Sequence, residues 1–201
     1  LALAVVVVAF VAVVLAQPST FQVERSAEMK APADIVFGYV EDLHRWSDWS
    51  PWDKLDPAQK KTYEGAEKGK GAIFAWSGND QVGEGRMTIT DARANEAVDV
   101  KLEFLKPWKS TNDVTFRLAA SGDATKVTWR MEGEADFLGK AMSLFMDMDA
   151  MVGKDFEAGL ATLKGIAEDA ARKRAEEEEA LRAAAAAAEA ADHDTYDQTE
   201  E

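Results

Sequence analysis

The amino-acid sequence predicts an α+β domain in which a curved antiparallel sheet wraps around a long C-terminal helix. Between residues 72 and 132, apolar and polar side chains alternate with a period of two, which is typical of strands with one buried face. From Phe137 onward, the spacing of apolar residues changes to the helical period. A sheet with one apolar face needs a cover, and the C-terminal helix is the element that can supply it.

The chain divides by composition into three segments. Residues 1–16 are almost wholly apolar, residues 20–168 have the mixed composition of a folded domain, and residues 169–201 are rich in Ala, Glu and Asp. The middle segment, with about 150 residues, is long enough for one domain with a hydrophobic core but too short for two.

The N-terminal segment reads LALAVVVVAFVAVVLA and carries no charge. A bilayer-spanning helix needs about 20 apolar residues, so a transmembrane anchor would require a few more before Leu1. We expect an uncleaved membrane anchor. A cleaved signal peptide is the main alternative, because Val14-Leu15-Ala16 has the small-residue pattern that such cleavage prefers. A buried core helix is a third interpretation.

Few basic residues follow this segment, with Arg25 and Lys30 standing among acids. The positive-inside rule therefore favours an extracytoplasmic domain. That domain is expected to be held at the membrane or, if a signal peptide is removed, to be secreted.

Residues 21–29 alternate like a half-buried strand, and a helix is expected to follow. Pro32 stands near the first turn of this helix and Asp34 lies within it, as is common at helix N-termini. The apolar stripe of the helix consists of Ile35, Val36, Tyr39, Val40 and Leu43. A Trp-rich connection then leads to the sheet.

About six strands are expected between this connection and the C-terminal helix. Turn-forming residues separate several of them, at Ser77-Gly78-Asn79-Asp80, Asn95-Glu96 and Ser121-Gly122-Asp123. One face of these strands is apolar and is formed by Ala72, Phe74, Trp76, Met87, Ile89, Val98, Val100, Leu102, Phe104, Val114, Phe116, Leu118, Val127, Trp129 and Met131. The other face carries charged residues, among them Arg86, Glu103 and Arg130.

The C-terminal helix is expected to begin at Phe137, with a Met-rich stretch followed by a kink or break at Gly153. The stripe that covers the sheet recurs at i, i+4, i+7 and i+11 and consists of Phe156, Leu160, Leu163 and Ala167. Beyond this stripe helix propensity persists without apolar partners, so the tail is expected to be a solvated helix that frays. Residues 192–201 are predicted to be disordered.

Three segments together carry a resemblance to a known family. They are MKAPADIVFGYV at 29–40, RWSDWSPW at 45–52 and GLATLK at 159–164. They look like the first strand-to-helix junction, the aromatic segment and the end of the closing helix in the START, Bet v 1 and polyketide-cyclase superfamily, also called SRPBCC. The resemblance covers residues 20–168 and is closest to bacterial proteins named polyketide cyclase or dehydrase by similarity. It implies the helix-grip fold, which hosts lipid carriers, cyclases and chaperone regulators alike.

Composition excludes several functional classes. The net charge is −14, and no basic cluster with interleaved aromatic residues is present, so no nucleic-acid partner is expected. The chain has no cysteine, which excludes disulfides, thiolate catalysis and Cys-based zinc sites. His44 is the one histidine before the tail, so His-based metal sites and catalytic triads are not expected either. No metal, cofactor or catalytic residue is predicted.

Ligand-binding residues are predicted on the apolar strand face and on the elements that cover it. They are Trp46, Trp49, Trp52, Phe74, Trp76, Met87, Phe104, Phe116, Trp129, Met142 and Met151. Each group has a structural alternative. The first three tryptophans form either an aromatic lip, a surface that meets lipid headgroups, or a core cluster. The strand residues either line a pocket or fill it, and the methionines form either an adaptable lid or ordinary core.

Asp147 and Asp149 are two residues apart on a helix and point in different directions, so they are expected to face solvent or cap the helix. With no evident nucleophile or base, the leading interpretation is binding, transfer or sequestration of a hydrophobic small molecule or lipid at a membrane surface. A cyclase- or dehydratase-type enzyme acting on a polyketide-like substrate is one alternative. A protein-interaction module that uses the tail or the outer sheet face is another.

Overall fold

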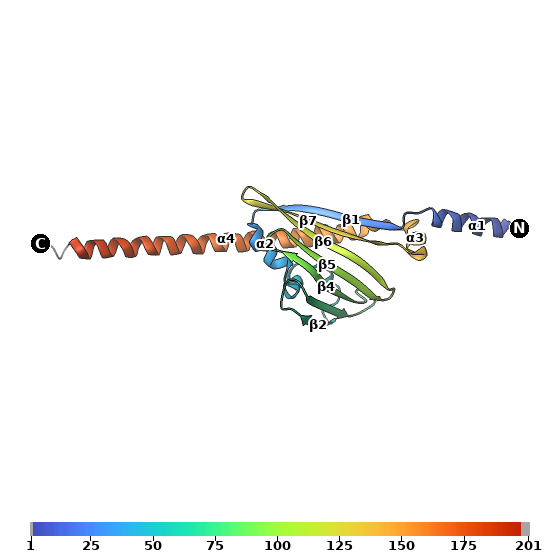
Figure 1. Ribbon diagram of the computed structural model, residues 1–201, viewed down its shortest axis with the longest axis horizontal. Coiled ribbons are helices and arrows are strands. Elements are labelled where there is room, and N and C mark those ends of the chain that lie inside the picture. The colour runs from blue at the N-terminus through green and yellow to red at the C-terminus, as the bar shows by residue number, and fades with distance from the viewer. Residues whose placement is uncertain (1, 198–201) are drawn as a thin grey trace.

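The computed structural model describes residues 2–197 of the chain, with side chains as far as residue 189. Seven antiparallel strands form one curved sheet in the order β1-β7-β6-β5-β4-β3-β2, which leaves β1 and β2 at opposite edges (Figure 1). The strands are β1 (Thr20–Met29), β2 (Lys60–Gly65), β3 (Ala72–Ser77), β4 (Glu84–Arg93), β5 (Ala97–Lys106), β6 (Ser110–Ser121) and β7 (Ala124–Glu134).

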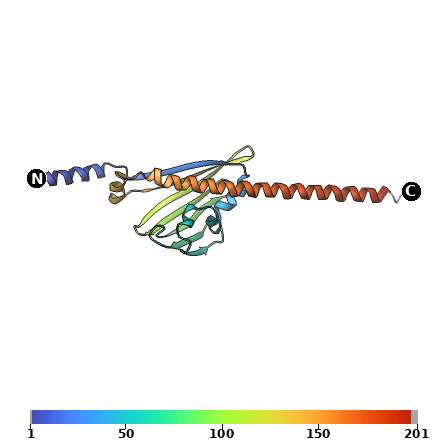
Figure 2. The ribbon, with the colours of Figure 1, turned by 180° about the vertical axis from the view of Figure 1, so that it is seen from behind.

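Helices cover one face of this sheet and extend beyond it at both ends. They are α1 (Ala2–Leu15), α2 (Ala33–Val40), the 3₁₀ helices η1 (Leu43–Asp48) and η2 (Pro51–Lys54), α3 (Phe137–Ser143) and α4 (Met148–Asp197). The long helix α4 crosses the sheet and continues far past it, whereas α1 projects from the opposite end of the molecule (Figures 1 and 2). The predicted fold, a curved antiparallel sheet with a long C-terminal helix, is confirmed.

The sheet has one apolar, concave face toward α4 and one polar face. Burial alternates along β6 and β7 as the period-two pattern predicted. The buried residues of these two strands include Val114, Phe116, Leu118, Val127, Trp129 and Met131. On the opposite face Arg86 and Glu103 form an exposed ion pair at 2.8 Å. The hydrophobic core therefore lies between the sheet and the helices.

The Trp-rich connection forms the two 3₁₀ helices, in which residues three apart lie on the same side. Trp46 Nε1 donates a hydrogen bond to the Val40 carbonyl at 2.9 Å, and Trp49 Nε1 donates one to the Tyr39 carbonyl at 3.4 Å. Carbonyls at the end of a helix lack intrahelical partners. The two indoles therefore close the C-terminal end of α2 while their rings enter the core.

The stripe predicted for the closing helix is the one that α4 buries against the sheet, through Phe156, Leu160, Leu163 and Ala167. The expected interruption at Gly153 is wrong, because α4 runs through this residue and the break lies at residues 144–147. The Asp147 carboxylate accepts a hydrogen bond from the Ala150 N–H at 3.0 Å and caps the first turn of α4.

Gly153 leaves room for Arg25, which reaches from β1 across α4. The guanidinium bonds to Asp149 at 2.9 Å and to Glu157 at 2.7 Å, one helical turn on either side of the glycine. A side chain at position 153 would overlap that guanidinium. The hydrogen bond from Arg25 holds the pKa of Asp149 below its usual value, and the same contacts raise the pKa of Arg25. These ion pairs fix how α4 lies along the edge strand.

The acidic tail continues α4 as an uninterrupted helix to Asp197. The predicted disorder is therefore wrong for residues 192–197, whereas residues 198–201 lie outside the described part. Alanine-rich sequence has high helix propensity, and pairs such as Arg182–Glu178 at 3.7 Å add support. Arg174 is paired with Asp34 of α2 at 2.5 Å, so contact with the domain extends to that residue.

The N-terminal helix α1 contains 14 residues and exposes apolar side chains on all its sides. Within residues 2–197, no helix combines the length and the apolar character needed to cross a bilayer, so the predicted transmembrane helix is not found.

Removal of residues 175–201 should change the thermal midpoint of unfolding by less than about 2 °C, because the described side chains beyond Arg174 bury little apolar area. Differential scanning calorimetry of the shortened and full chains measures this. A second chain that ends at Gly165 also loses Ala167 and the Arg174–Asp34 pair, and should melt clearly lower. Equal losses in both chains would mean that the tail docks on the domain.

Candidate functional site

The concave face consists of two unlike halves. Beneath α4 lies a packed half, whose aromatic residues are Trp46, Trp49, Phe116, Trp129 and Phe156, all buried. Toward the other edge lies an open half, formed by part of β3, β4 and β5. Ile89 and Val100 of these strands are buried, but five apolar residues are only half-buried: Phe74, Trp76, Met87, Leu102 and Phe104. A ligand on this face would therefore meet a filled region on one side and an accessible one on the other.

The packed half is filled by rings that contact one another directly. Trp129 stacks on Phe156 of α4 with centroids 4.0 Å apart and planes 8° from parallel. Trp49 meets Trp129 edge to face at 5.5 Å and Phe116 at 5.9 Å. Such contacts between large rings account for much of the energy of a small core. They leave no space for a ligand between the sheet and α4 at this level.

Gly159 permits this close approach of α4. A Cβ at position 159 would lie 2.8 Å from the Trp129 ring and 3.3 Å from Pro51. The indole N–H of Trp129 is buried in the stack and has no hydrogen-bond partner among the described residues. A buried, unpaired donor costs about 1–3 kcal/mol, which the aromatic packing must offset.

The open half carries a row of aromatic rings that come from β2, β3 and β5 and cross β4. Tyr63 lies 5.1 Å from Phe74, Phe74 stacks on Trp76 at 5.9 Å, and Trp76 meets Phe104 edge to face at 5.9 Å. Gly85 pairs with Trp76 in the sheet and, lacking a Cβ, lets the indole lie across β4. Trp76 Nε1 donates to the Val82 carbonyl at 2.9 Å. The row therefore presents an apolar surface, and the Trp76 N–H within it already has a hydrogen-bond partner.

Polar groups at the β2 side of this row are paired with one another. His44 stacks on Tyr63 at 4.1 Å and its Nδ1 lies 3.1 Å from the Asp42 carboxylate. Lys61 is paired with Asp53 at 2.5 Å. Burial raises the pKa of Tyr63. The side chains at this rim thus hold each other in place at the edge of the apolar row.

Asn112 is a residue of the concave face that the sequence interpretation missed. It is 4% exposed and lies in register between Leu102 of β5 and Gly133 of β7. A side chain at position 133 would overlap the Asn112 amide oxygen. An amide beside the open half can hydrogen-bond a polar group of a ligand. A signal was present, because Asn112 occupies an inward position in the alternation that continues with Val114 and Phe116.

The predicted ligand-binding residues do not surround one shared cavity. Trp46, Trp49, Phe116 and Trp129 fill the packed half, and Trp52 lies at its margin, 5.7 Å from Trp129. Phe74, Trp76, Met87 and Phe104 line the open half.

The two methionines predicted to line the site lie apart from both halves of the concave face. Met142 is half-buried on α3, and Met151 is 50% exposed on α4. The expectation that Met151 lies in the interior is wrong. The stripe of α4 that faces the sheet includes its neighbour Val152, and adjacent helical residues point about 100° apart.

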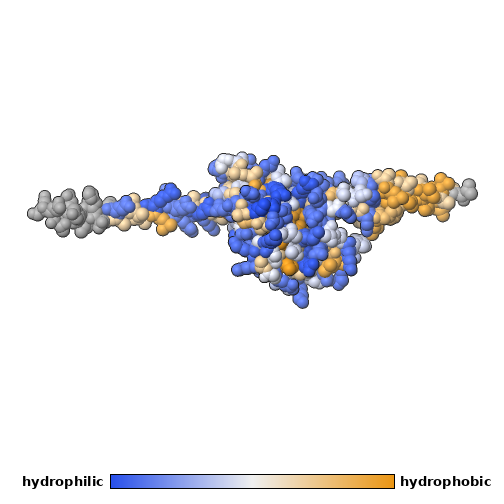
Figure 3. All heavy atoms as spheres, viewed as in Figure 1, coloured by the Kyte–Doolittle hydropathy of each residue, from blue (hydrophilic) through white to orange (hydrophobic). Residues whose placement is uncertain are grey.

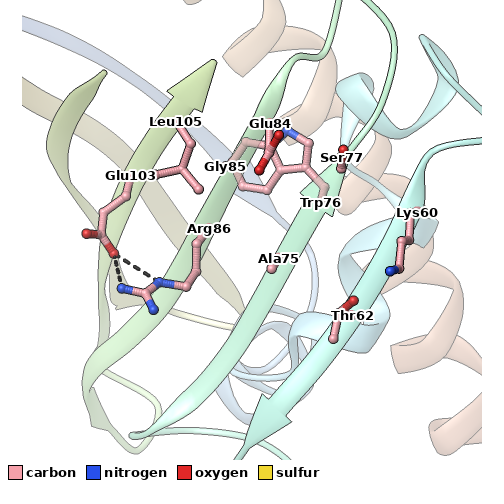
Figure 4. A pocket seen from close by; sticks show the side chains of 10 residues that line it. All are labelled: Lys60, Thr62, Ala75, Trp76, Ser77, Glu84, Gly85, Arg86, Glu103 and Leu105. Carbon is pink, nitrogen blue, oxygen red and sulfur yellow. Dashed lines mark hydrogen bonds and ion pairs between the residues drawn. The ribbon is translucent and has the colours of Figure 1, made fainter. Parts of the chain in front are cut away.

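Two surface hollows are open to solvent, and neither lies within the concave interior. One, of about 370 Å³, lies over the polar face near the ends of β2–β5, where Arg86 and Glu103 are paired (Figure 4). The other, of about 570 Å³, lies between Phe21 and the segment 143–149. Among the described residues, no group of acidic or histidine side chains is arranged to hold a metal ion.

A family model described as "Polyketide cyclase / dehydrase and lipid transport" matches residues 20–168. No relative is found among curated proteins.

Solved structures share the fold at low identity. Ginseng major latex-like protein 151 from Panax ginseng has a TM-score of 0.53 and 12% identity, covering 75% of this chain and 99% of that one. The Aha1 dimer from Colwellia psychrerythraea gives 0.53 and 15%, covering 74% and 96%. The di-domain ARO/CYC BexL of the BE-7585A biosynthetic pathway gives 0.54 and 15%, covering 79% and 53%.

Gly159→Ala should destabilise the domain by about 1–3 kcal/mol, because the added methyl group presses on the Trp129 ring and displaces α4. Gly165→Ala is the matched control on the same helix, since nothing lies within 4 Å of the added Cβ. It should stabilise by about 0.5–1 kcal/mol. Urea unfolding of both variants measures the difference. A neutral Gly159→Ala would show that the Trp129 contact does not hold α4 in place.

Phe116→Ala should cost about 3–5 kcal/mol of unfolding free energy, because the side chain is fully buried in the packed half. Phe104→Ala removes the same ring from the half-buried row and should cost clearly less. The two variants therefore separate the core from the candidate site by stability alone. Equal costs would mean that the open half is as tightly packed as the rest.

Proposed function

The chain belongs to the polyketide cyclase / dehydrase and lipid transport family, and from this premise we propose that it binds a hydrophobic small molecule or lipid. The proposed site is the open half of the concave face. The observation that carries the proposal is the row Phe74, Trp76 and Phe104, left half-exposed on a sheet whose other half is sealed by Trp129 and Phe156. Covering these exposed rings with an apolar ligand removes them from water, which is favourable in free energy.

The ligand that fits this surface is flat or chain-like and mostly apolar. Ring faces of Phe74 and Trp76 offer stacking to a planar ligand and van der Waals contact to an acyl chain. Asn112 is the buried polar group beside the row and would bond a carbonyl or hydroxyl of the ligand. One polar anchor within an apolar site fixes the orientation of a ligand at little cost.

Binding without chemistry is favoured over catalysis because few titratable groups lie near the row. The Lys61 ammonium is held by Asp53. His44 lies at the rim with its Nδ1 on Asp42, the usual arrangement of a general base, so a reaction would have to run through His44. A cyclase- or dehydratase-type reaction on a polyketide-like substrate is the alternative that the experiment below tests.

The proposal includes attachment to a membrane through α1. Val5, Val6, Val7 and Val8 are consecutive and each is more than half exposed, so apolar side chains face every direction around this helix. A helix that is apolar all round needs cover on every side, which the hydrocarbon of a bilayer supplies. Ligand binding would then take place next to the lipid that supplies or receives the ligand.

Purified full-length protein should retain a hydrophobic compound that organic extraction and mass spectrometry identify. Phe104→Ala and Trp76→Ala should each lower its affinity by roughly tenfold, since each removes an aromatic ring from the apolar surface that the ligand covers. Asn112→Val should lower affinity mainly for ligands that carry a carbonyl or hydroxyl. Arg86→Gln, on the polar face of the same sheet, is the control and should bind as the unchanged protein does.

Recovery of the compound in unchanged form after prolonged incubation is the expected result. Conversion of the compound that stops in His44→Gln or Lys61→Met, with binding retained, would contradict the carrier and establish the enzyme. Absence of any bound apolar compound would overturn the proposed ligand binding. A bound compound whose affinity is unchanged in both Phe104→Ala and Trp76→Ala would overturn the proposed site.

A further inference from the structure

The exposed large apolar side chains of the folded domain all lie at one end of the sheet. This apolar end consists of Leu55, Leu105, Trp108, Phe137, Leu138, Phe145, Met146, Met148 and Met151. Phe145 is 80% exposed and Trp108 is 63% exposed. Scattered exposed apolar residues are ordinary on a soluble surface, but a set confined to one end marks an interaction surface.

The register of the strands shows that these residues share an end. Thr20 pairs with Glu134, Phe104 pairs with Ser110, and Ser77 pairs with Glu84, so the ends of all these strands are aligned. Trp108 lies in the β5–β6 turn at this end, and Leu55 is tied to the β3–β4 turn by a hydrogen bond from Asn79 to its carbonyl at 3.4 Å. Segment 137–148 follows β7 directly.

The opposite end of the sheet is polar. Its turns expose Glu67 and Lys68, Asn95 and Glu96, and Ser121 and Asp123. No exposed large apolar residue lies in these turns. If exposed large apolar residues were placed by chance, they would occur at both ends of the sheet. Their restriction to one end therefore marks that end as a distinct surface.

The apolar end is continuous with α1. The Ala135 N–H donates to the Ser19 carbonyl at 2.9 Å, and Lys140 Nζ donates to the Ser19 hydroxyl at 2.9 Å. Helices α1 and α3 contact each other, and Val14 is fully buried. Figure 3 shows apolar residues gathered over α1, next to the mostly polar domain. The segment that is apolar on every side and the apolar end of the sheet therefore form one surface.

We propose that the apolar end docks on the surface of a lipid bilayer, so that the domain stands on the membrane that α1 enters. A bilayer is favoured over a second copy because α1 and the apolar end both need cover, and a hydrocarbon phase covers them together. Both signs of charge occur at this end: Lys106 is paired with Glu84 at 2.7 Å, Lys109 follows Trp108, and Asp136 caps α3 by accepting from the Gly139 N–H. Docking is therefore driven by apolar burial and does not require anionic lipid.

This orientation places the tail in solvent. The tail of α4 leaves from the end opposite α1 (Figure 1) and carries four consecutive glutamates, Glu176–Glu179. Anionic headgroups repel such a segment, and here it points away from them. Phe104 is near the apolar end of β5, so a lipid could reach the row without a long path through water. That last point rests on the proposed ligand binding, and the docking rests on the proposed attachment of α1 to a membrane.

Four single-cysteine variants of the full chain test the docking, because the protein contains no cysteine of its own. Phe145→Cys and Trp108→Cys lie at the apolar end, and Glu96→Cys and Asp123→Cys are matched positions in exposed turns at the other. Each is labelled with a polarity-sensitive nitrobenzoxadiazole dye and reconstituted with phosphatidylcholine vesicles. The first two should show a blue-shifted emission and quenching by nitroxide-labelled lipid, and the other two neither. The shift should survive a change from about 0.1 to 1 M NaCl, since screening weakens only charge attraction.

Each contrary result has a distinct meaning. Co-sedimentation with vesicles but no difference among the four dyes would overturn the docking and leave attachment through α1 standing. A shift at Phe145→Cys that appears without vesicles and grows with protein concentration would assign the apolar end to a second copy. No association with vesicles would overturn both membrane proposals, and extraction of the bound compound would still decide ligand binding by itself.

Discussion

Trp129 of β7 and Phe156 of α4 stack face to face, and the position of the closing helix depends on this contact. Gly159 lets the helix come close enough, and Trp49 and Phe116 also contact the Trp129 ring. Because interiors are packed as densely as organic crystals, rings that fill this volume exclude any other molecule from it. The same contact therefore stabilises the fold and decides where a ligand cannot lie.

A second constraint holds α4 at its N-terminal end, where Arg25 bonds to Asp149 and Glu157 around Gly153. The stack at Phe156 and the ion pairs at Asp149 and Glu157 act on the same stretch near the start of α4 and fix it over β1 and β7. Farther across the sheet, η1 contacts β3 and Ile89 of β4 is buried. The part of these strands that α4 does not cover keeps Phe74, Trp76 and Phe104 half-buried. The accessible apolar row is thus a consequence of where the helix is attached, and no separate pocket-forming element is required.

Much of the fold could be predicted because periodicity is a local property. The alternation placed Phe116 and Trp129 on the buried face, and helical spacing identified Phe156 and Leu160 as the stripe of the closing helix. Which of these rings contact each other depends on register and helix position, and no local pattern contains that information. For this reason the sequence could not separate the residues that fill the interior from those that line an accessible surface.

Polar residues at inward strand positions are a sequence signal for contacts that periodicity alone does not predict. Arg25, Asn112 and Thr125 each interrupt an apolar alternation. Arg25 has its partners in an acid–glycine–acid series spaced by four residues on α4, and the Thr125 hydroxyl donates to the Ala31 carbonyl at 2.8 Å. A buried polar group must find a hydrogen-bond partner or cost stability. Such positions therefore point to a long-range contact or, as proposed for Asn112, to a ligand.

The Met-rich stretch shows how composition and position carry different information. Flexible thioethers suit either a core or an adaptable surface, so composition alone could not choose between them. In the structure Met146, Met148 and Met151 are exposed near the break between α3 and α4, at the end of the sheet from which α1 emerges. Met151 is one helical position off the stripe that includes Val152 and Phe156, and Met146 precedes α4. Met148 lies four residues before Val152, but it is the first residue of α4 and is exposed like the other two.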